Sequence, residues 1–370
     1  MVLGGGPAGC STALALRRHG IRGVLLVEAG DYQAVRIGES IAPESSLLLE
    51  KLGIWQDFLS EGHEPCLGSC SLWGGDAPGY NDFLYNPHGT GWHLDRRRFD
   101  AFLARKTVEG GIELWDRTRY DGIGLLGEQG FSLRLATAGG PRTVSTRFVV
   151  DGTGSRSRLA RSMSATRRFH DRFSYVAAFL ELPASSVLSH LTLLEAVEYG
   201  WWYAALLPDR RVAVAVASDP EIVKKEALHR KDVWLTRLSE TRHLCGELSG
   251  CSPAHDGMVL RSALSFLLDN PCGRGWLAVG DAASSYDPIS SQGIYKALLD
   301  GLQAAEAIAA WLDGEAGALE RYQAAIAARF DDYLRVRNYF YEREQRWPSA
   351  PFWARRRARV TVSSRRPLSN

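Results

Sequence analysis

The stretch Val2-Leu3-Gly4-Gly5-Gly6-Pro7-Ala8-Gly9, followed by Val24-Leu25-Leu26-Val27-Glu28, decides how the rest of this chain can be arranged. A short apolar strand enters a turn with glycines at positions 4, 6 and 9, a helix follows over residues 10–19, and a second strand ends in an acid. Gly4 permits the tight turn, Gly6 lets a pyrophosphate approach the backbone, and Gly9 lets helix and strand pack closely. The unpaired N–H groups of the helix then face the phosphates. This order predicts a dinucleotide-binding βαβ unit.

The acid that ends the second strand supports this interpretation. Glu28 follows Gly9 by nineteen residues and can hydrogen-bond a ribose 2′-hydroxyl, which disfavours a dinucleotide that carries a 2′-phosphate. The alternative is a glycine-rich turn in some other βαβ unit. A second match to the glycine spacing, residues 122–127, precedes a strand pattern rather than a helix. It cannot offer a helix N-terminus to phosphate, so we exclude it.

Composition limits the classes of protein to consider. The chain has 370 residues, of which 45% are hydrophobic, so two or three domains are expected. Its 44 basic and 42 acidic residues nearly cancel, and no overall charge favours nucleic acid or a membrane surface. No run approaches the roughly 18 apolar residues of a membrane span. The apolar N-terminus is the first strand rather than a signal peptide. That strand is unusually short, as if a few N-terminal residues were missing.

The cysteines favour a reduced environment. Their spacings match neither CxxC pairs nor zinc knuckles, so no metal site is expected. Without a secretory context they are interpreted as reduced and mostly buried, which predicts a cytoplasmic protein. The six are Cys10, Cys66, Cys70, Cys245, Cys251 and Cys272.

The order of patterns predicts domains built from several segments. Residues 1–170 and 271–312 form the nucleotide-binding domain, with a strand insertion at about 60–95. Residues 171–270 form a mostly β domain, and residues 313–370 supply C-terminal helices and a basic tail. The tail is interpreted as a solvated, partly disordered end, with a docking strip for an acidic partner as the alternative. Expected elements are helices at 43–52, 96–108, 230–240, 291–312 and 317–345 and a β-meander at 112–148.

Two more motifs follow predicted strands. They are Asp151-Gly152-Thr153-Gly154, and Gly280-Asp281 followed by Asp287-Pro288-Ile289-Ser290-Ser291-Gln292-Gly293. Together with the first glycine turn, they resemble the FAD-dependent monooxygenases and halogenases of the p-hydroxybenzoate-hydroxylase type, over essentially the whole chain. The resemblance implies FAD as cofactor and an α/β fold. In that fold, a Rossmann-like FAD-binding domain of the glutathione-reductase type is interleaved with a β-sheet substrate domain and a helical C-terminal region.

The resemblance also implies roles at FAD. Asp281 would bind the ribityl and phosphate portion, Asp151 would close the pyrophosphate side, and the loop before Gly293 would run beside the isoalloxazine. The helix that starts there would stabilise the negative charge of a reduced flavin. Arg36 would touch the adenosine or pyrophosphate end, unless it is a solvated surface residue, and Arg96 would approach FAD. The expected cofactor-binding residues are Gly4, Gly6, Pro7, Ala8, Gly9, Glu28, Arg36, Ser40, Arg96, Asp151, Gly152, Gly280, Asp281, Pro288, Gln292 and Gly293.

The reaction is narrowed by two further resemblances. Gly38-Glu39-Ser40-Ile41-Ala42-Pro43 resembles the tryptophan-halogenase branch. Halogenases need a lysine whose ammonium carries or orients hypohalous acid, but Cys66 stands at that place. Their Trp-x-Trp-x-Ile-Pro run is only partly matched by residues 200–208. Halogenation is therefore disfavoured.

Ser71-Leu72-Trp73-Gly74 and residues 82–100 look like a narrower subgroup. These are flavoprotein maturases that modify a tryptophan of a partner polypeptide to build tryptophylquinone cofactors, including those of quinohaemoprotein amine dehydrogenase and the lysine and glycine oxidases. The resemblance implies ring hydroxylation with O2 through a flavin C4a-hydroperoxide, with NAD(P)H or a separate flavin reductase as electron source.

Such a step needs a dry pocket, which aromatic side chains supply. The candidates, each of which could instead be core packing, are Trp73, Trp92, Trp201, Trp202 and Tyr203. Acid–base or nucleophilic candidates are His63, Glu64, Cys66 and His93, with His88 and Glu195 as further possibilities. A lone histidine is more often structural. Two rival functions stay open: a halogenase or small-aromatic hydroxylase, and a flavoprotein that chaperones a partner polypeptide without oxidising it.

Overall fold

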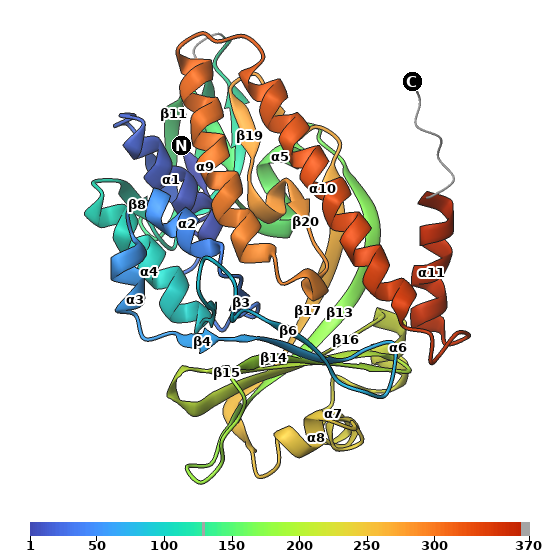
Figure 1. Cartoon of the computed structure of the whole chain (residues 1–370). Coiled ribbons are helices and arrows are strands. Elements are labelled where there is room, and N and C mark those ends of the chain that lie inside the picture. The colour runs from blue at the N-terminus through green and yellow to red at the C-terminus, as the bar shows by residue number, and fades with distance from the viewer. Residues whose placement is uncertain (128–129, 364–370) are drawn as a thin grey trace. The chain divides into compact units, whose positions relative to one another are not determined.

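The computed structural model describes residues 1–127 and 130–363 (Figure 1). It has a mixed α/β fold in two compact units. Unit 1 comprises Met1–Gly62, Arg96–His170 and Leu264–Asp331, and unit 2 comprises His63–Asp95, Asp171–Ala263 and Asp332–Asn370. The expected α/β fold class is confirmed.

The two units divide the chain differently from the sequence-based domains in three respects. Residues 63–95 belong to unit 2 rather than to an insertion within the nucleotide-binding domain, residues 264–270 belong to unit 1 rather than to the mostly β domain, and the C-terminal helices are shared between the units at 331/332. These differences arise because strands and helices far apart in sequence pair within each unit, which local patterns do not reveal.

Unit 1 is built on a six-stranded sheet. Its strand order is β18-β19-β12-β1-β2-β8, and all neighbours are parallel except β18 and β19. The strands are β1 (Val2–Leu3), β2 (Leu25–Val27), β8 (Glu113–Trp115), β12 (Val149–Asp151), β18 (Cys272–Gly273) and β19 (Trp276–Ala278). Because parallel strands end at the same sheet edge, the loops that follow β1, β2, β12 and β19 all lie along one edge.

The helices of unit 1 include two that pack unusually closely. Ser11 Oγ donates a 2.7 Å hydrogen bond to the Leu298 carbonyl, and a Cβ at Gly301 would lie 2.6 Å from the Ser11 side chain. This glycine therefore lets α9 (Gly293–Leu312) lie directly beside α1 (Pro7–Arg18), as Figure 1 shows. The other helices are α2 (Ser45–Lys51), α3 (Trp55–Leu59), α4 (Arg96–Glu109) and α5 (Arg158–Ser162).

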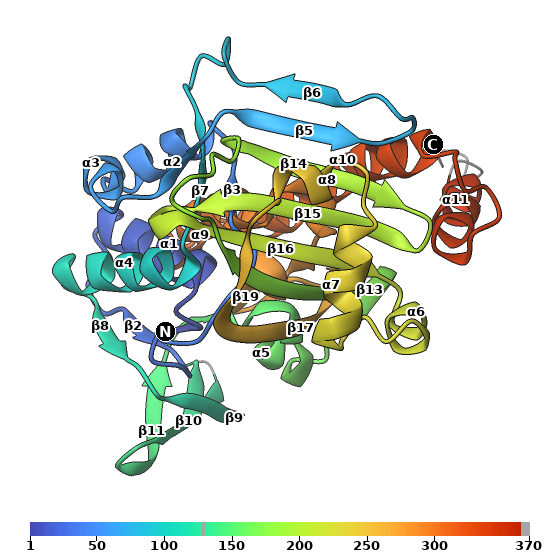
Figure 2. The same cartoon turned by 90° about the horizontal axis from the view of Figure 1, so that it is seen from below.

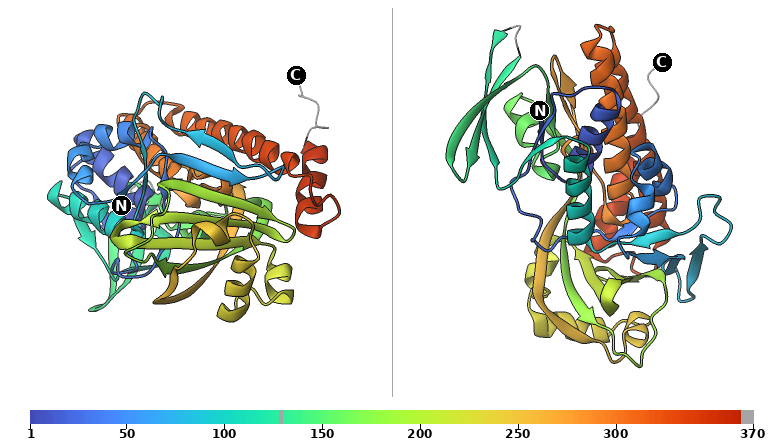
Figure 3. Two further views of the ribbon diagram at one scale, coloured as in Figure 1. Left: turned by 60° about the horizontal axis from the view of Figure 1, so that its bottom comes forward. Right: turned by 90° about the vertical axis from the view of Figure 1, so that its left-hand side faces the viewer.

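A small antiparallel sheet completes unit 1. It consists of β9 (Arg119–Leu125), β10 (Phe131–Thr137) and β11 (Gly140–Thr146), drawn in teal to green in Figure 3. The second glycine match begins inside β9, which confirms that it forms a strand. The expected meander needs one correction, because its first strand, β8, pairs with β2 in the main sheet instead.

Unit 2 is built on a mostly antiparallel sheet. Its strands run in the order β17-β13-β16-β15-β14-β5-β6, with α7 and α8 over one face (Figure 2), and residues 252–263 of β17 belong to this unit. The strands are β5 (Gly68–Leu72), β6 (Gly79–Asp82), β13 (Arg167–Glu181), β14 (Leu191–Val197), β15 (Gly200–Leu207) and β16 (Arg211–Ser218). A further pair, β4 (Glu64–Cys66) and β7 (Gly91–His93), is antiparallel. The helices are α6 (Pro220–Lys225), α7 (Lys231–Ser239) and α8 (Leu244–Glu247).

The remaining elements are β3 (Ser40–Ile41), β17 (Ser252–Leu268), β20 (Ser284–Ser285), α10 (Ala318–Arg343) and α11 (Pro351–Ser363). All six cysteines, each within the described residues, are free thiols. None of the helices described here is both long and apolar enough to cross a membrane.

Up to Arg357, the basic tail is not the solvated end that the sequence suggested. Arg356 is fully buried, with Nε 3.0 Å from Asp171 Oδ2 and Nη2 2.8 Å from Asp219 Oδ1. Its guanidinium also lies 3.6 Å from the Phe352 ring centroid. These contacts fasten α11 to unit 2. The last residues of the tail lie outside the described part.

Candidate functional site

The three separated motifs meet at one edge of the unit 1 sheet. Gly4 has a φ of 101°, and a Cβ there would lie 2.1 Å from the Gly152 carbonyl oxygen. Gly152 N–H in turn donates to the Leu3 carbonyl at 2.7 Å. Gly280, with a φ of 58°, lies so close to Ala8 that a Cβ would approach its methyl group to 2.7 Å. The glycine turn and both aspartate motifs therefore surround one place, as the sequence predicted.

Gly6 and Gly9 have different reasons to be glycine. A Cβ at Gly9 would lie 1.8 Å from the Gly4 carbonyl oxygen, so close packing of α1 on β1 requires glycine there. At Gly6 the φ is an ordinary −78°, and the nearest described atom to a Cβ is Arg36 Nη1 at 3.8 Å. Packing within unit 1 therefore leaves space at Gly6. That space lies at the N-terminus of a twelve-residue helix, where a phosphate group can reach backbone N–H groups.

Glu28 is part of the same turn. It is nearly buried, and its carboxylate accepts hydrogen bonds from Gly5 N–H at 2.7 Å and Gly30 N–H at 2.8 Å. Tyr32 supports the turn by donating to the Gly5 carbonyl at 3.2 Å. Glu28 therefore stabilises the loop itself, and its contact with a ribose hydroxyl stays a prediction.

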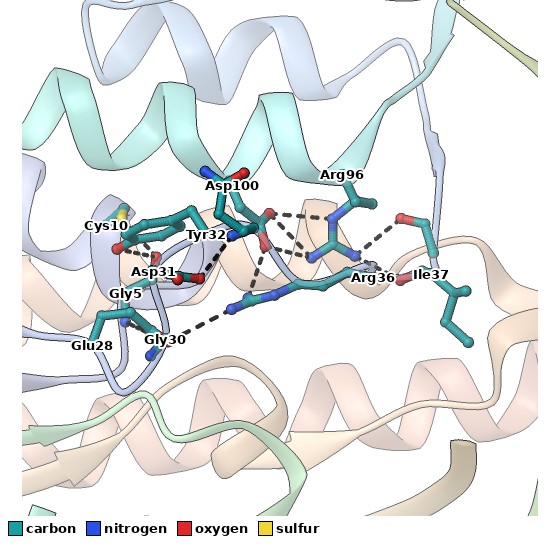
Figure 4. Close-up of polar contacts among 12 residues, drawn as sticks. Gly5, Cys10, Glu28, Gly30, Asp31, Tyr32, Arg36, Ile37, Arg96 and Asp100 are labelled. Carbon is teal, nitrogen blue, oxygen red and sulfur yellow. Dashed lines mark hydrogen bonds and ion pairs between the residues drawn. The ribbon is translucent and has the colours of Figure 1, made fainter. Parts of the chain in front are cut away.

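Arg36 and Arg96 converge on one buried carboxylate, that of Asp100 (Figure 4). Arg36 Nη1 donates to Asp100 Oδ2 at 2.8 Å, and Arg96 donates from Nε and Nη2 at 3.2 Å. Arg96 also donates to the carbonyls of Ile37 and Gly38 at 2.8 and 3.2 Å. Asp100 thereby holds the 36–38 loop in place and leaves the Arg36 side chain 31% exposed beside Gly6. A guanidinium at that position can bind a phosphate oxygen.

Asp151 and Asp281 differ in burial. Asp151 is fully buried, and its oxygens accept from Thr153 N–H at 2.9 Å and Ala160 N–H at 2.7 Å. Burial raises the pKa of this carboxyl group. Its side chain therefore shapes the turn after β12, and a contact of Asp151 or Gly152 with the cofactor stays a prediction. The Asp281 side chain is 47% exposed, with Lys296 Nζ 3.4 Å from Oδ1, and can contact a ligand directly.

The loop from Pro288 to Gly293 ends at a second helix N-terminus, that of α9. Asp287 Oδ1 caps the first turn of this loop by accepting from Ile289 N–H at 3.1 Å, and Ser291 takes a left-handed φ of 50°. A Cβ at Gly293 would have no described atom within 4 Å. The N-terminus of the twenty-residue helix α9 is thus open to a ligand that carries negative charge.

These features fit FAD. Two long helices present open N-termini at glycines that packing does not require, an arginine lies beside the first, and a half-exposed carboxylate can accept hydroxyl hydrogen bonds. Unit 1 is therefore a dinucleotide-binding fold of the flavoprotein class. The chain belongs to the FAD binding domain family, whose model matches residues 1–335, and the expected cofactor, FAD, is confirmed.

Similar proteins are FAD-dependent enzymes. LodB of Marinomonas mediterranea, which is named as an FAD-dependent oxidoreductase, is 31% identical over 363 residues, which cover 97% of this chain and 96% of LodB. The structure of CmlS, a flavin-dependent halogenase, superposes with a TM-score of 0.88 at 23% identity, over 98% of this chain and 69% of CmlS. QhpG, a peptidyl tryptophan dihydroxylase essential for tryptophylquinone cofactor biogenesis, superposes with a TM-score of 0.71 at 26% identity, over 96% and 77%. This chain is likewise an FAD-dependent enzyme.

The predicted acid–base residues lie in unit 2. His93 and Cys66 share a neighbour, because Thr192 Oγ1 lies 2.8 Å from His93 Nε2 and 3.7 Å from Cys66 Sγ. Burial lowers the pKa of His93 to about 4 and raises that of the Cys66 thiol, so both are neutral near pH 7. Glu64 Oε1 lies 3.1 Å from His190 Nδ1. His93 can therefore orient a group by hydrogen bonding, but it is poorly suited to carry a proton at neutral pH.

For two of the other three candidates the structure gives only the degree of burial, and the third, Glu195, has a structural use. His63 is buried just before β4. His88 is half-buried and lies in the segment between β6 and β7. Glu195 accepts from Arg242 N–H at 2.6 Å and from His243 and Leu244 N–H at 3.0 Å. Its carboxylate caps the N-terminal end of α8, which is a structural task.

The predicted aromatic pocket is not a single surface. Neighbouring side chains on a strand point to opposite faces, so Trp201 and Trp202 in β15 cannot line one pocket. Trp202 packs against Trp234 of α7 with centroids 5.0 Å apart, inside the hydrophobic core. Trp201 donates to Tyr341 Oη at 3.2 Å on the other face. Core packing is therefore the role of Trp202.

Three of the aromatic residues remain candidates for a substrate pocket, because they lie on or near the sheet face that Tyr341 contacts. They are Trp73, Trp201 and Tyr203. The ring centroids of Trp73 and Tyr341 lie 6.1 Å apart, and Trp73 Nε1 donates to the Phe340 carbonyl at 2.7 Å. Tyr203 lies on the same face of β15 as Trp201, because alternate residues of a strand share a face. Trp92 is half-buried in β7. The sequence interpretation missed this grouping because Tyr341 lies far along the chain.

Two buried charges of unit 1 were also missed. Asp100 and Asp300 are each essentially unexposed, and they bind groups of the candidate site: Asp100 accepts from Arg36 and Arg96, and Asp300 from Gly280 N–H. Both lie four residues after a cation, Arg96 and Lys296, on an expected helix. This i, i+4 spacing was the available signal.

Proposed function

We propose that this protein is an FAD-dependent monooxygenase that hydroxylates an aromatic ring, that of a tryptophan, in a peptide or protein substrate. The observation that carries the proposal is the similarity to a peptidyl tryptophan dihydroxylase over 96% of the chain. It is supported by the similarity to LodB over nearly the whole of both chains. The proposed setting is the biogenesis of a tryptophylquinone cofactor in a partner polypeptide.

Each part of the unit 1 site has a task in this proposal. The α1 N-terminus at Gly6 binds the pyrophosphate with Arg36, and Asp281 accepts hydrogen bonds from the ribityl chain. The N-terminus of α9 at Gly293 faces the isoalloxazine and stabilises negative charge on it. Bound FAD, reduced by NAD(P)H or a separate reductase, supplies two electrons, so that one atom of O2 enters a ring C–H bond and the other leaves as water.

The surroundings of Cys66 and of Lys296 in the described chain support hydroxylation over halogenation. The sequence places Cys66 where halogenases have their lysine, and this buried thiol is neutral because burial raises its pKa. Within the described chain, Lys296 is the one buried lysine, and its Nζ donates to the Ser284 carbonyl at 2.6 Å. Its ammonium is therefore committed to unit 1 and is not offered to hypohalous acid.

Mass spectrometry of tryptophan-containing peptides tests the proposal. The holoprotein is incubated with a reductant, O2 and either chloride or bromide, and matched peptides with phenylalanine in place of tryptophan serve as controls. We expect a gain of about 16 or 32 Da on tryptophan, and each added oxygen should come from labelled O2. An unchanged peptide mass in the presence of tight binding would contradict the proposal and favour a chaperone.

Halogenation is the second candidate, because CmlS superposes with a TM-score of 0.88. The same reactions separate the two. A chlorine or bromine isotope pattern on the peptide or on a small aromatic compound would replace hydroxylation by halogenation.

A further inference from the structure

Lys296 lies in the first turn of α9 and is 2% exposed. Its ammonium donates to the Ser284 carbonyl at 2.6 Å and lies 3.4 Å from Asp281 Oδ1 and 3.9 Å from Asp300 Oδ2. It also lies 5.0 Å from the Tyr286 ring centroid. The ammonium is thus surrounded by a carbonyl, two carboxylates and an aromatic face.

A buried ammonium is costly unless its surroundings compensate its charge. Asp300 is fully buried and has a second cation, because Arg329 Nη2 lies 2.6 Å from its Oδ1. Asp300 Oδ2 also accepts from Gly280 N–H at 3.0 Å. Arg329 therefore compensates Asp300 without reaching Asp281. Among the contacts of the described residues, Lys296 is the group that connects this buried cluster to the exposed carboxylate.

The position of Asp281 indicates what its contact with Lys296 does. This residue follows the Gly280 turn, which packs against Ala8 of the first glycine motif. Its side chain is 47% exposed, while the ammonium approaches one oxygen from the protein side. The contact with Lys296 restricts the rotamers of Asp281 and leaves the rest of the carboxylate to face a ligand.

We propose that Lys296 is a positioning residue that orients Asp281 for FAD. The inference rests on the proposed contact between Asp281 and the ribityl portion of the cofactor. A carboxylate that is oriented before binding loses less rotational freedom when FAD arrives, so affinity rises without any contact between Lys296 and the cofactor.

Equilibrium titration of apoprotein with FAD, followed by the quenching of flavin fluorescence, tests the role. The variants are Lys296→Met, which keeps the length without the charge, Asp281→Ala, and the double variant. We expect Lys296→Met to raise the Kd for FAD roughly 3- to 10-fold. In the Asp281→Ala background the same substitution should leave the Kd unchanged, because the group that it positions is gone.

Arg329→Met is the matched control. It removes the other cation of Asp300, so it should lower the melting temperature of the apoprotein, and any effect on the Kd should be equal in the wild-type and Asp281→Ala backgrounds. A Lys296→Met effect that persists in the Asp281→Ala background would overturn the proposal, since Lys296 would then act on the fold in general.

The outcomes also separate this inference from the one on which it rests. If Asp281→Ala leaves the Kd for FAD unchanged, the contact of Asp281 with the cofactor is wrong. Should Lys296→Met not fold, Lys296→Gln, which also removes the charge, replaces it in the same cycle and must show the same dependence on Asp281. If neither variant folds, Lys296 serves the core of unit 1 rather than Asp281, and the proposal fails.

Discussion

Gly6→Ala should separate cofactor binding from folding. The backbone at Gly6 has φ −78° and ψ −175°, which alanine adopts without strain. Its Cβ would meet only Arg36 Nη1, at an ordinary contact distance of 3.8 Å. The added methyl group would instead occupy the space through which a pyrophosphate approaches the start of α1. The variant should therefore fold normally and bind FAD poorly.

The two magnitudes can be worked out separately. Alanine is a poorer N-cap than glycine by up to about 1 kcal/mol. It also reduces the freedom of the unfolded chain, which stabilises by about 0.4–1 kcal/mol. These terms largely cancel, so the stability of the apoprotein should change by less than about 1 kcal/mol. Losing one charge-assisted phosphate hydrogen bond costs about 1.5–3 kcal/mol, which raises the Kd for FAD roughly 10- to 150-fold.

The assay compares urea unfolding of apoprotein with fluorescence titration of FAD. Gly23→Ala is the matched control, because Gly23 is exposed, has no positive φ and would place its Cβ more than 4 Å from any described atom. It should change neither quantity appreciably. Gly9→Ala should fail to fold, because its Cβ would lie 1.8 Å from the Gly4 carbonyl oxygen. Wild-type FAD affinity in Gly6→Ala would refute the placement of the pyrophosphate at this turn.

Three further predictions follow from the same contacts. Gly293→Ala should stabilise the apoprotein by up to about 1 kcal/mol through helix propensity and yet weaken FAD binding; equal or tighter binding in the titration would contradict a flavin at this helix end. Arg356→Met should cost about 3 kcal/mol in urea unfolding, because Asp171 and Asp219 stay buried and each loses one of its described arginine partners, and an unchanged midpoint would show that α11 is held by apolar contacts alone. The pKa of His93 is about 4 in the folded protein and near 6.5 in the unfolded chain, so the unfolded state binds more protons between about pH 4 and pH 6.5. The free energy of unfolding therefore falls by up to about 3 kcal/mol as the pH drops from about 6.5 to about 4. His93→Gln should flatten the unfolding free energy over that range, and a profile identical to wild type would exclude this titration.

The site could be predicted from sequence where local chemistry was sufficient. Gly4 and Gly9 are required by backbone geometry within a few residues, and the i, i+4 pattern of α9 shows its buried face. The prediction that β1, β12 and β19 end along one sheet edge then followed from the apolar strands that end in glycine and aspartate motifs, whereas their order in the sheet came from the structure. The roles of the aromatic residues of β15 were harder to predict. Strand alternation places Trp201 and Trp202 on opposite faces, but which face is core depends on partners from distant segments.

The amino-acid sequence by itself predicted a dinucleotide-binding unit, because glycines at fixed spacing, a helix N-terminus and a strand-end acid are local features with one shared use, and the resemblance of its three motifs to a flavoprotein family implied FAD. Only the tertiary structure decided which of those acids is free to meet the cofactor. Asp151 and Asp281 look alike in the sequence, yet the first is buried and bonded to its own turn, whereas the second stays half-exposed with Lys296 behind it. Burial and charge pairing depend on segments that approach one another only after folding, so no local pattern could separate the two.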